Sequence, residues 1–328
     1  MITKNGNMDF APLAEYLKRV PYELIHTTLY DAATLYEGFV PGQPEAEQDY
    51  YDRRVYQHYR TTGKFPNSIE EATARILHDH SMRVAVSKFV KAHDYMKFVG
   101  VMGGHGLQRT EAMYRQIVFL SKRLTEQGFM MLSGGGPGAM EATHLGAWLA
   151  GRGDDEVEEA LQMLTPAPTF GDEGWLATAI KVMERFPQTT YESLSIPTWT
   201  YGHEPPTPFA THIAKLFDNS IREDLILTLS FGGVIFTPGS AGTMQEVFQN
   251  AVQNHYLSFG FASPMIFFGQ TFWTNDIPVF PLLQGLMAVG KYKNLSLTLT
   301  DDTENVMRQL LDFQEKVRTN PEAFKVID

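Results

Sequence analysis

The stretch VIFTPGSAGTMQEVFQNAVQNHY, residues 234–256, decides the fold of this chain. A short apolar run at residues 234–236 ends at Pro238-Gly239, and a turn of small residues then leads into apolar residues at helical spacing. This order predicts a buried strand, a tight turn and a helix. Gly239 and Gly242 allow positive φ and the close approach of a ligand to the backbone. Because the first amides of a helix lack partners and carry partial positive charge, the turn is a predicted phosphate site.

The same turn offers backbone hydrogen-bond donors, and the helix that follows it carries a carboxylate in its second turn. The predicted phosphate ligands are the amides of Gly239, Ser240, Ala241, Gly242 and Thr243. The hydroxyl of Thr243 adds a further donor. Glu246 follows about one turn into the helix, where its carboxylate reaches the bound molecule without occupying the anion site. An ordinary strand-to-helix turn with a surface glutamate fits the same residues.

A second glycine-rich turn, SGGGPG at residues 133–138, lies between a predicted strand at 129–132 and a predicted helix at 139–150. Consecutive glycines leave room for a ribose or a phosphate against the backbone. The predicted nucleotide contacts in this turn are Gly135, Gly136 and Gly138. Since ligands of a doubly wound sheet bind beyond the carboxyl ends of neighbouring strands, we expect both turns to face one ligand. Close packing of a helix on a strand also favours glycine in such a turn.

The motif PGSAGTMQE resembles the PGGxGTxxE signature of the LOG-type family, which are Rossmann-like phosphoribohydrolases. GGGPGAMEA at residues 134–142 resembles the first glycine-rich turn of that family, and NSIRE at 219–223 stands where the family has its catalytic arginine. EPPTP at 204–208 is similar to a segment of the longer branch, the pyrimidine/purine nucleotide 5'-monophosphate nucleosidases. The resemblance covers roughly residues 97–315.

The resemblance implies an enzyme that hydrolyses the N-glycosidic bond of nucleoside 5'-monophosphates to free base and ribose 5-phosphate. It implies that Arg222 and Glu246 are catalytic. Ser240 replaces the second glycine of the signature, which is compatible only if this position does not need a positive φ. A non-catalytic nucleotide-binding protein, a sensor or carrier on the same fold, is the alternative. We expect no cofactor, since a decarboxylase would need a pyridoxal phosphate lysine and the glycine-rich turns contain none.

Composition limits the classes of protein that fit. The chain has 328 residues, of which 43% are hydrophobic, enough to bury a large core. A net charge of -11 argues against non-specific binding to nucleic acid or to an anionic membrane. The absence of cysteine excludes disulfides, cysteine nucleophiles and thiolate metal sites. Without a signal-type segment or about 18 consecutive apolar residues, the expected location is the cytoplasm.

Other nucleotide and metal motifs are incomplete. Residues 98–102 form a predicted strand, and the turn GGHG after it, with Gly104 as a predicted contact, resembles a first Rossmann turn. No third glycine of the dinucleotide fingerprint follows, and no Gly-Lys pair precedes serine or threonine as a Walker A motif requires. His78-Asp79-His80 does not predict a metal site, because residues two apart on a helix do not face each other.

Strands that alternate with helices predict an α/β fold with a doubly wound, mostly parallel Rossmann-like sheet. Residues 1–95 are a predicted helical extension, in which Ser68 and Glu71 form a capping box. Residues 96–328 are the predicted catalytic domain, with a helical insertion at about 152–188 that serves as a lid or an interface. Within the catalytic domain, after the insertion, we expect a strand at 193–200 and one long helix at 209–230. A homo-oligomer is expected.

Overall fold

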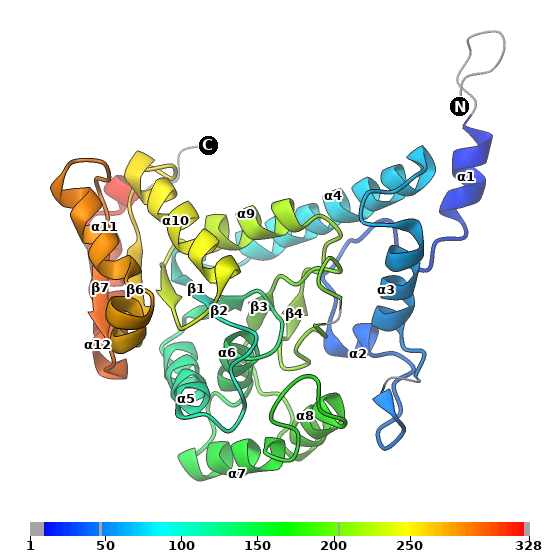
Figure 1. Ribbon diagram of the computed structural model, residues 1–328, viewed down its shortest axis with the longest axis horizontal. Coiled ribbons are helices and arrows are strands. Elements are labelled where there is room, and N and C mark those ends of the chain that lie inside the picture. The colour runs from blue at the N-terminus through cyan, green and yellow to red at the C-terminus, as the bar shows by residue number, and fades with distance from the viewer. Residues whose placement is uncertain (1–9, 46–47, 203, 325–328) are drawn as a thin grey trace, which may run out of the picture.

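The computed structural model describes residues 10–45, 48–202 and 204–324. Seven parallel strands form one sheet in the order β4-β3-β2-β1-β5-β6-β7 (Figure 1). The strands are β1 Phe98–Met102, β2 Met130–Ser133, β3 Ser193–Ser195, β4 His212–Ile213, β5 Gly233–Phe236, β6 Pro264–Phe268 and β7 Ser296–Thr300. This sheet confirms the predicted α/β Rossmann-like fold. The order reverses between β1 and β5, so the expected ligand crevice lies at their carboxyl ends.

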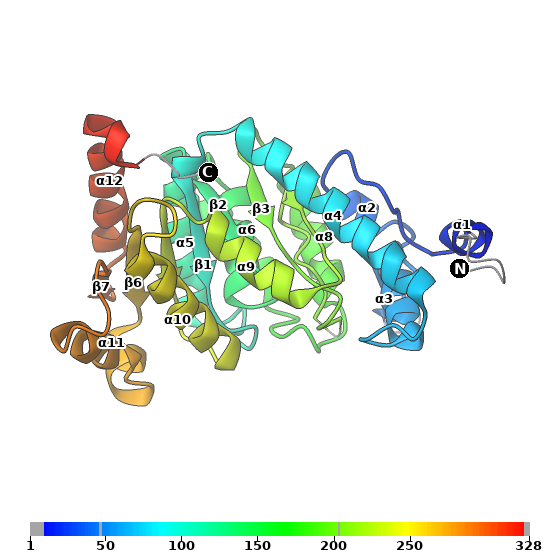
Figure 2. The same ribbon diagram turned by 90° about the horizontal axis from the view of Figure 1, so that it is seen from above.

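Helices cover both faces of the sheet (Figures 1 and 2). One face carries α4, α9, α10 and α11, and the other carries α5, α6 and α12, with α7 and α8 packed beyond α6. The α-helices are α1 Ala11–Leu17, α2 Ala32–Leu35, α3 Tyr51–Thr62, α4 Ile69–Lys91, α5 Ala112–Glu126, α6 Ala139–Trp148, α7 Asp154–Leu164, α8 Trp175–Arg185, α9 Asn219–Leu229, α10 Ala241–Tyr256, α11 Val279–Ala288 and α12 Thr303–Thr319. Short 3-10 turns span Tyr95–Lys97 and Pro321–Phe324, and a π turn spans Phe272–Asp276.

The central strands alternate between two apolar layers. In β1, Phe98 and Met102 join the core beneath α4, α9 and α10, whereas Val99 and Val101 join the core beneath α5 and α6. Successive side chains of a strand point to opposite faces, so an unbroken apolar run suits a strand that is covered on both sides. Every residue of β1 is buried.

Two predicted elements are wrong in their extent. The helix expected at 209–230 begins only at Asn219, with Asp218 as its N-cap, and the chain before it forms β4. Ile213 exchanges backbone hydrogen bonds with Tyr30 at 3.0 and 2.8 Å, so pairing with a distant segment overrides the local apolar pattern. The strand expected at 193–200 ends at Ser195, shortly before Pro197, which cannot donate to a ladder.

Helix α4 begins as predicted, but only half of the expected capping box forms. The Ser68 hydroxyl accepts a hydrogen bond from the Glu71 amide at 3.1 Å. The Glu71 carboxylate does not return to Ser68 and instead accepts from Arg75 Nε at 2.7 Å and contacts His58 Nε2 at 3.0 Å. A side chain one turn along α4 and one from α3 therefore replace the backbone partner expected for Glu71.

The N-terminal helices hold the start of α9. Asp79 of α4 is buried, and its carboxylate accepts from the amides of Phe217 and Asp218 at 3.0 and 2.9 Å. Close by, Lys215 donates to Asp52 of α3 at 2.6 Å. Residues of the N-terminal segment also share one apolar core with the sheet. The division of the chain at residue 95 stays a prediction.

We expect Asp79→Ala to lower the free energy of unfolding by about 1.5 to 3 kcal/mol, because it leaves the buried amide of Phe217 and the partly buried amide of Asp218 without their charged acceptor. Urea unfolding followed by circular dichroism measures this. His80→Ala, at the next and exposed position of α4, is the control and should leave the midpoint unchanged. Equal midpoints for both variants would show that the carboxylate does not hold α9.

Candidate active site

Three turns meet at the carboxyl ends of β1, β2 and β5. The Gly104 amide, after β1, donates to the Pro238 carbonyl, after β5, at 3.1 Å. The Ala139 amide, at the start of α6, donates to the Gly104 carbonyl at 3.2 Å. These direct backbone contacts define what we call the glycine junction, formed by Gly104, Gly138 and Gly239. The junction brings both glycine-rich turns to one place, as the sequence predicted.

At two positions of the junction, Gly138 and Gly239, neighbouring atoms leave no room for a side chain. Gly138 has a φ of 70°, and a Cβ there would lie 2.4 Å from the Gly104 carbonyl oxygen. A Cβ on Gly239 would lie 2.1 Å from the Thr243 hydroxyl and 3.0 Å from the Gly104 amide nitrogen. Neither Gly239 nor Gly242 adopts the positive φ that the sequence allowed. At Gly239 the requirement is the close approach of the Thr243 side chain and of the Gly104 amide, not backbone handedness.

The first turn of α10 is open for an anion. Ser240 is the N-cap, with an extended backbone at a φ of -112°, so this position does not need the glycine of the family signature. The amides of Ala241, Gly242 and Thr243 have no carbonyl one turn earlier to receive them. This turn contains no acidic side chain that would compete with an anion.

A hollow of about 250 Å³ opens in front of this turn. We call it the α10 hollow. Its lining residues are Gly103, Gly104, His105, Met140, Tyr201, Glu204, Arg222, Glu223, Ser240, Gly242, Thr243 and Glu246. The turns after β1 and β5 and helices α6, α9 and α10 therefore all contribute to one concave surface.

Arg222 of α9 and Glu246 of α10 meet in this hollow. The Arg222 Nη1 and Glu246 Oε1 atoms are 3.7 Å apart, and the two residues are only 9% and 8% exposed. Arg222 Nε donates to the Ile196 carbonyl at 2.8 Å, which orients the guanidinium. A Cβ on Gly134 would lie 1.9 Å from Arg222 Nη2, so the second glycine-rich turn makes room for this side chain.

The environment of Glu246 favours its neutral form. Burial raises the pKa of the Glu246 carboxyl to about 7, Arg222 opposes this shift, and the negative charge of Glu223 adds to it. Glu223 itself is held by Gln245 and Asn219, whose side-chain amides donate to it at 2.7 Å each. Glu246 therefore changes its charge close to neutral pH.

The remaining predicted contacts are not lining residues of the α10 hollow. Gly239 and Ala241 belong to the turn at the start of α10, but they are not among the lining residues of the hollow. Gly135, with a φ of 72°, packs on Ser195, and a Cβ on Gly136 would lie 3.5 Å from Glu204 Oε2. Gly135, Gly136 and Gly138 do not line the hollow, and their contact with a ligand stays a prediction.

Sequence reasoning did not find His105, Met140 and Tyr201 as lining residues. His105 Nδ1 lies 3.4 Å from Glu204 Oε1, so the turn after β1 touches the EPPTP segment across the hollow. A signal existed, because His105 interrupts a run of glycines in a turn of the expected crevice. Tyr201 begins the proline-rich loop at residues 201–208, which the sequence indicated as a possible frame of the pocket without singling out this side chain.

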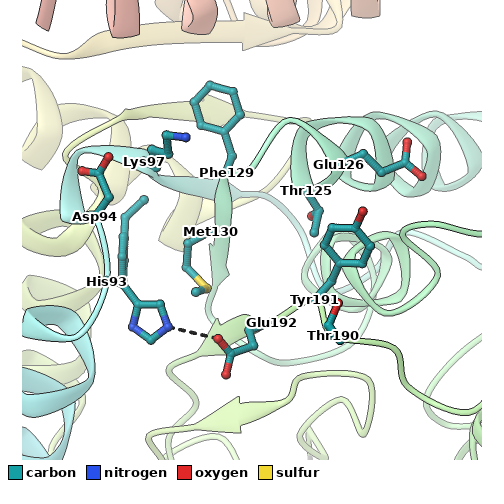
Figure 3. Close-up of a pocket in the computed structure, with 12 residues that line it drawn as sticks. His93, Asp94, Lys97, Thr125, Glu126, Phe129, Met130, Thr190, Tyr191 and Glu192 are labelled. Carbon is teal, nitrogen blue, oxygen red and sulfur yellow. Dashed lines mark hydrogen bonds and ion pairs between the residues drawn. The ribbon is translucent and has the colours of Figure 1, made fainter. Parts of the chain in front are cut away.

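Another hollow, of about 200 Å³, lies at the amino ends of β1 and β2 (Figure 3). His93 and Glu192 point toward one another there, with Nε2 and Oε2 3.0 Å apart (Figure 3). None of the predicted site residues lines it. It also lies at the wrong end of the strands for a ligand of a doubly wound sheet.

The sequence matches no protein-family model and no curated protein. Among solved structures, the chain is similar to the molybdenum cofactor binding protein from the phototrophic bacterium Rippkaea orientalis, with 16% identity, a TM-score of 0.42, and 66% of this chain and 96% of that chain covered. It is similar to the molybdenum cofactor carrier protein from Chlamydomonas reinhardtii, with 15% identity, a TM-score of 0.39 and coverage of 66% and 98%. It is also similar to TM1055, a structural genomics target, with 17% identity, a TM-score of 0.41, and 66% of this chain and 98% of that chain covered. Likeness at this level does not extend to ligands or activity.

Two further features bear on the class of protein. Within residues 10–45, 48–202 and 204–324, no helix is both long enough and apolar enough to cross a bilayer. In the same part of the chain, no three histidine or acidic side chains are grouped so that they would hold a metal ion.

We expect Gly138→Ala to lower the free energy of unfolding by more than about 1 kcal/mol, because the added Cβ meets backbone atoms at a positive φ. Gly285→Ala in α11, where a Cβ meets nothing within 4 Å, is the control. It should raise stability by roughly 0.5 to 1 kcal/mol, as alanine does within a helix. Urea unfolding of both variants measures the difference, and a stable Gly138→Ala protein would contradict the junction geometry.

Proposed function

We propose that this chain is a LOG-type phosphoribohydrolase that hydrolyses nucleoside 5'-monophosphates to free base and ribose 5-phosphate. The observation that carries the proposal is the meeting of Arg222 and Glu246, 3.7 Å apart, beside the open first turn of α10. These two residues come from different helices, and the resemblance implies a catalytic role for both. Their convergence at the switch point of the sheet supports a shared role at a ligand.

In this proposal the phosphate binds at the start of α10. The amides of Ala241, Gly242 and Thr243 supply donors, and the helix end supplies partial positive charge. An acidic chain with a net charge of -11 attracts a phosphate only through such local donors. The ribose then extends from this turn toward Glu246, about one helical turn further along.

The reaction breaks the bond between the ribose and the base. The electron pair of that bond leaves with the base, which takes up a proton, and water adds to the ribosyl carbon. Positive charge develops on the sugar in the transition state, and a nearby carboxylate stabilises it. Glu246 supplies this charge or orients the water. Arg222 holds the phosphate or Glu246 in place, with its own position set by the Ile196 carbonyl.

We expect Glu246→Gln and Arg222→Ala each to lower kcat on nucleoside monophosphates by about a hundredfold or more, because each removes a preorganised charge. Chromatography of released base from a panel of monophosphates and free nucleosides measures this. Glu184→Gln, at an exposed position of α8, is the matched control and should be fully active. Nucleotide-dependent thermal stabilisation of the wild type without any release of base would instead indicate the nucleotide-binding alternative.

The pH dependence of the reaction provides an independent check on Glu246. Because burial raises its pKa to about 7, the carboxylate form is lost as the pH falls below that value. The value of kcat/KM should therefore rise with pH through about 7, whereas the pKa of an ordinary glutamate is 4.5. Glu246→Gln should lack this rise in its residual activity. The phosphate of the substrate titrates in the same way with the wild type and with Glu246→Gln. A rise of kcat/KM in both proteins would therefore come from the substrate and not from Glu246.

A further inference from the structure

A third hollow, of about 230 Å³, shares the lining residue His105 with the α10 hollow. We call it the insertion hollow, because its far wall is the segment between α7 and α8. His105, Leu107, Pro137, Pro168, Phe170 and Trp175 are among its lining residues. We propose that the insertion hollow holds the base of the nucleotide, an inference that rests on the proposed function and adds to it the site that selects the base.

The lining of the insertion hollow suits a flat, neutral ring. His105 and Phe170 lie 5.8 Å apart in an edge-on arrangement, and Leu107 and two prolines complete an apolar surface. The one acidic lining residue is Glu141, which Arg109 neutralises through hydrogen bonds of 2.9 and 2.5 Å. A second phosphate would find no free cation among the lining residues. An aromatic ring would find surfaces on which to stack.

The wall that the insertion provides is held firmly in place. Arg109 is 3% exposed, and its Nη1 donates to the carbonyls of Ala167 and Trp175 at 3.1 Å each. These carbonyls lie on either side of the segment that contains Pro168 and Phe170. The guanidinium also lies 4.7 Å from the Trp175 ring centroid. The hollow is therefore preformed, which lowers the entropic cost of binding a ring.

The sizes of the two hollows support one ligand that spans both. Their volumes are about 250 and 230 Å³, and ligand pockets usually measure roughly 300 to 1,000 Å³. Neither hollow reaches that range alone, and the two together do. His105 is a lining residue of both, and its side chain is 45% exposed, so it lies at the boundary that the ligand would cross. With the phosphate at α10, the base extends past His105.

The proposal is tested with two variants of the insertion hollow. Phe170→Ala removes a stacking surface, and Leu107→Trp fills the space. Each should raise KM for nucleoside monophosphates roughly tenfold to a hundredfold, the effect expected from loss of one base–aromatic contact. The inhibition constant of ribose 5-phosphate, which has no base, should stay unchanged in both. Phe119→Ala on α5, a partly buried phenylalanine that lines neither hollow, is the control and should alter neither constant.

The outcomes separate this inference from the proposed function. Unchanged KM values, or KM and the inhibition constant rising together, would overturn the base site while leaving the hydrolase intact. If the wild type releases no base, calorimetric dissociation constants for a monophosphate and for ribose 5-phosphate replace the kinetic constants, and the same selective loss would support the site. A wild type that binds neither compound would overturn both proposals.

Discussion

Direct contact between backbones at the glycine junction is the constraint on which the site depends. Gly104 hydrogen-bonds to Pro238 on one side and accepts from Ala139 on the other, so the turns after β1, β2 and β5 lie in contact. A single methyl group on Gly138 would overlap with the turn after β1, and one on Gly239 would overlap with the Thr243 side chain. Because no side chains separate the turns, the open end of α10 and the start of α6 face the same hollow.

Arg222 reaches this hollow through supports from distant parts of the chain. Asp79 of α4 holds the backbone just before α9, and the Ile196 carbonyl after β3 orients the guanidinium. The N-terminal segment thus contributes to the site without lining the α10 hollow. Glu246 shows the cost of the arrangement, since burial raises its pKa to about 7 and disfavours its charged form. A group poised between two protonation states is typical of functional sites and not of stable cores.

Local patterns predicted most of the elements, because apolar periodicity reports directly on which faces are buried. They failed where a distant partner outweighed the local preference. The sequence pattern before Asn219 predicts a helix, but His212 and Ile213 pair with β3 and Tyr30 and form a strand instead. At Glu71 the competing partner was partly local, because Arg75, one turn along α4, and His58 of α3 contact the carboxylate that was expected to cap the helix. The buried Arg109–Glu141 pair escaped notice, because sequence alone does not reveal that two charged residues are enclosed together.

The sequence by itself determined the class of fold and the two glycine-rich turns, because turn chemistry and helix ends are encoded within a few consecutive residues. Arg222 became a candidate only through the resemblance of its motif to the family, and Glu246 through its place after the turn together with that resemblance. Only the tertiary structure decided that Arg222 and Glu246 lie 3.7 Å apart, that Glu246 is buried enough to shift its pKa, and that the insertion forms the wall of a further hollow. Distance and burial depend on segments far apart in the chain, and no local pattern contains them.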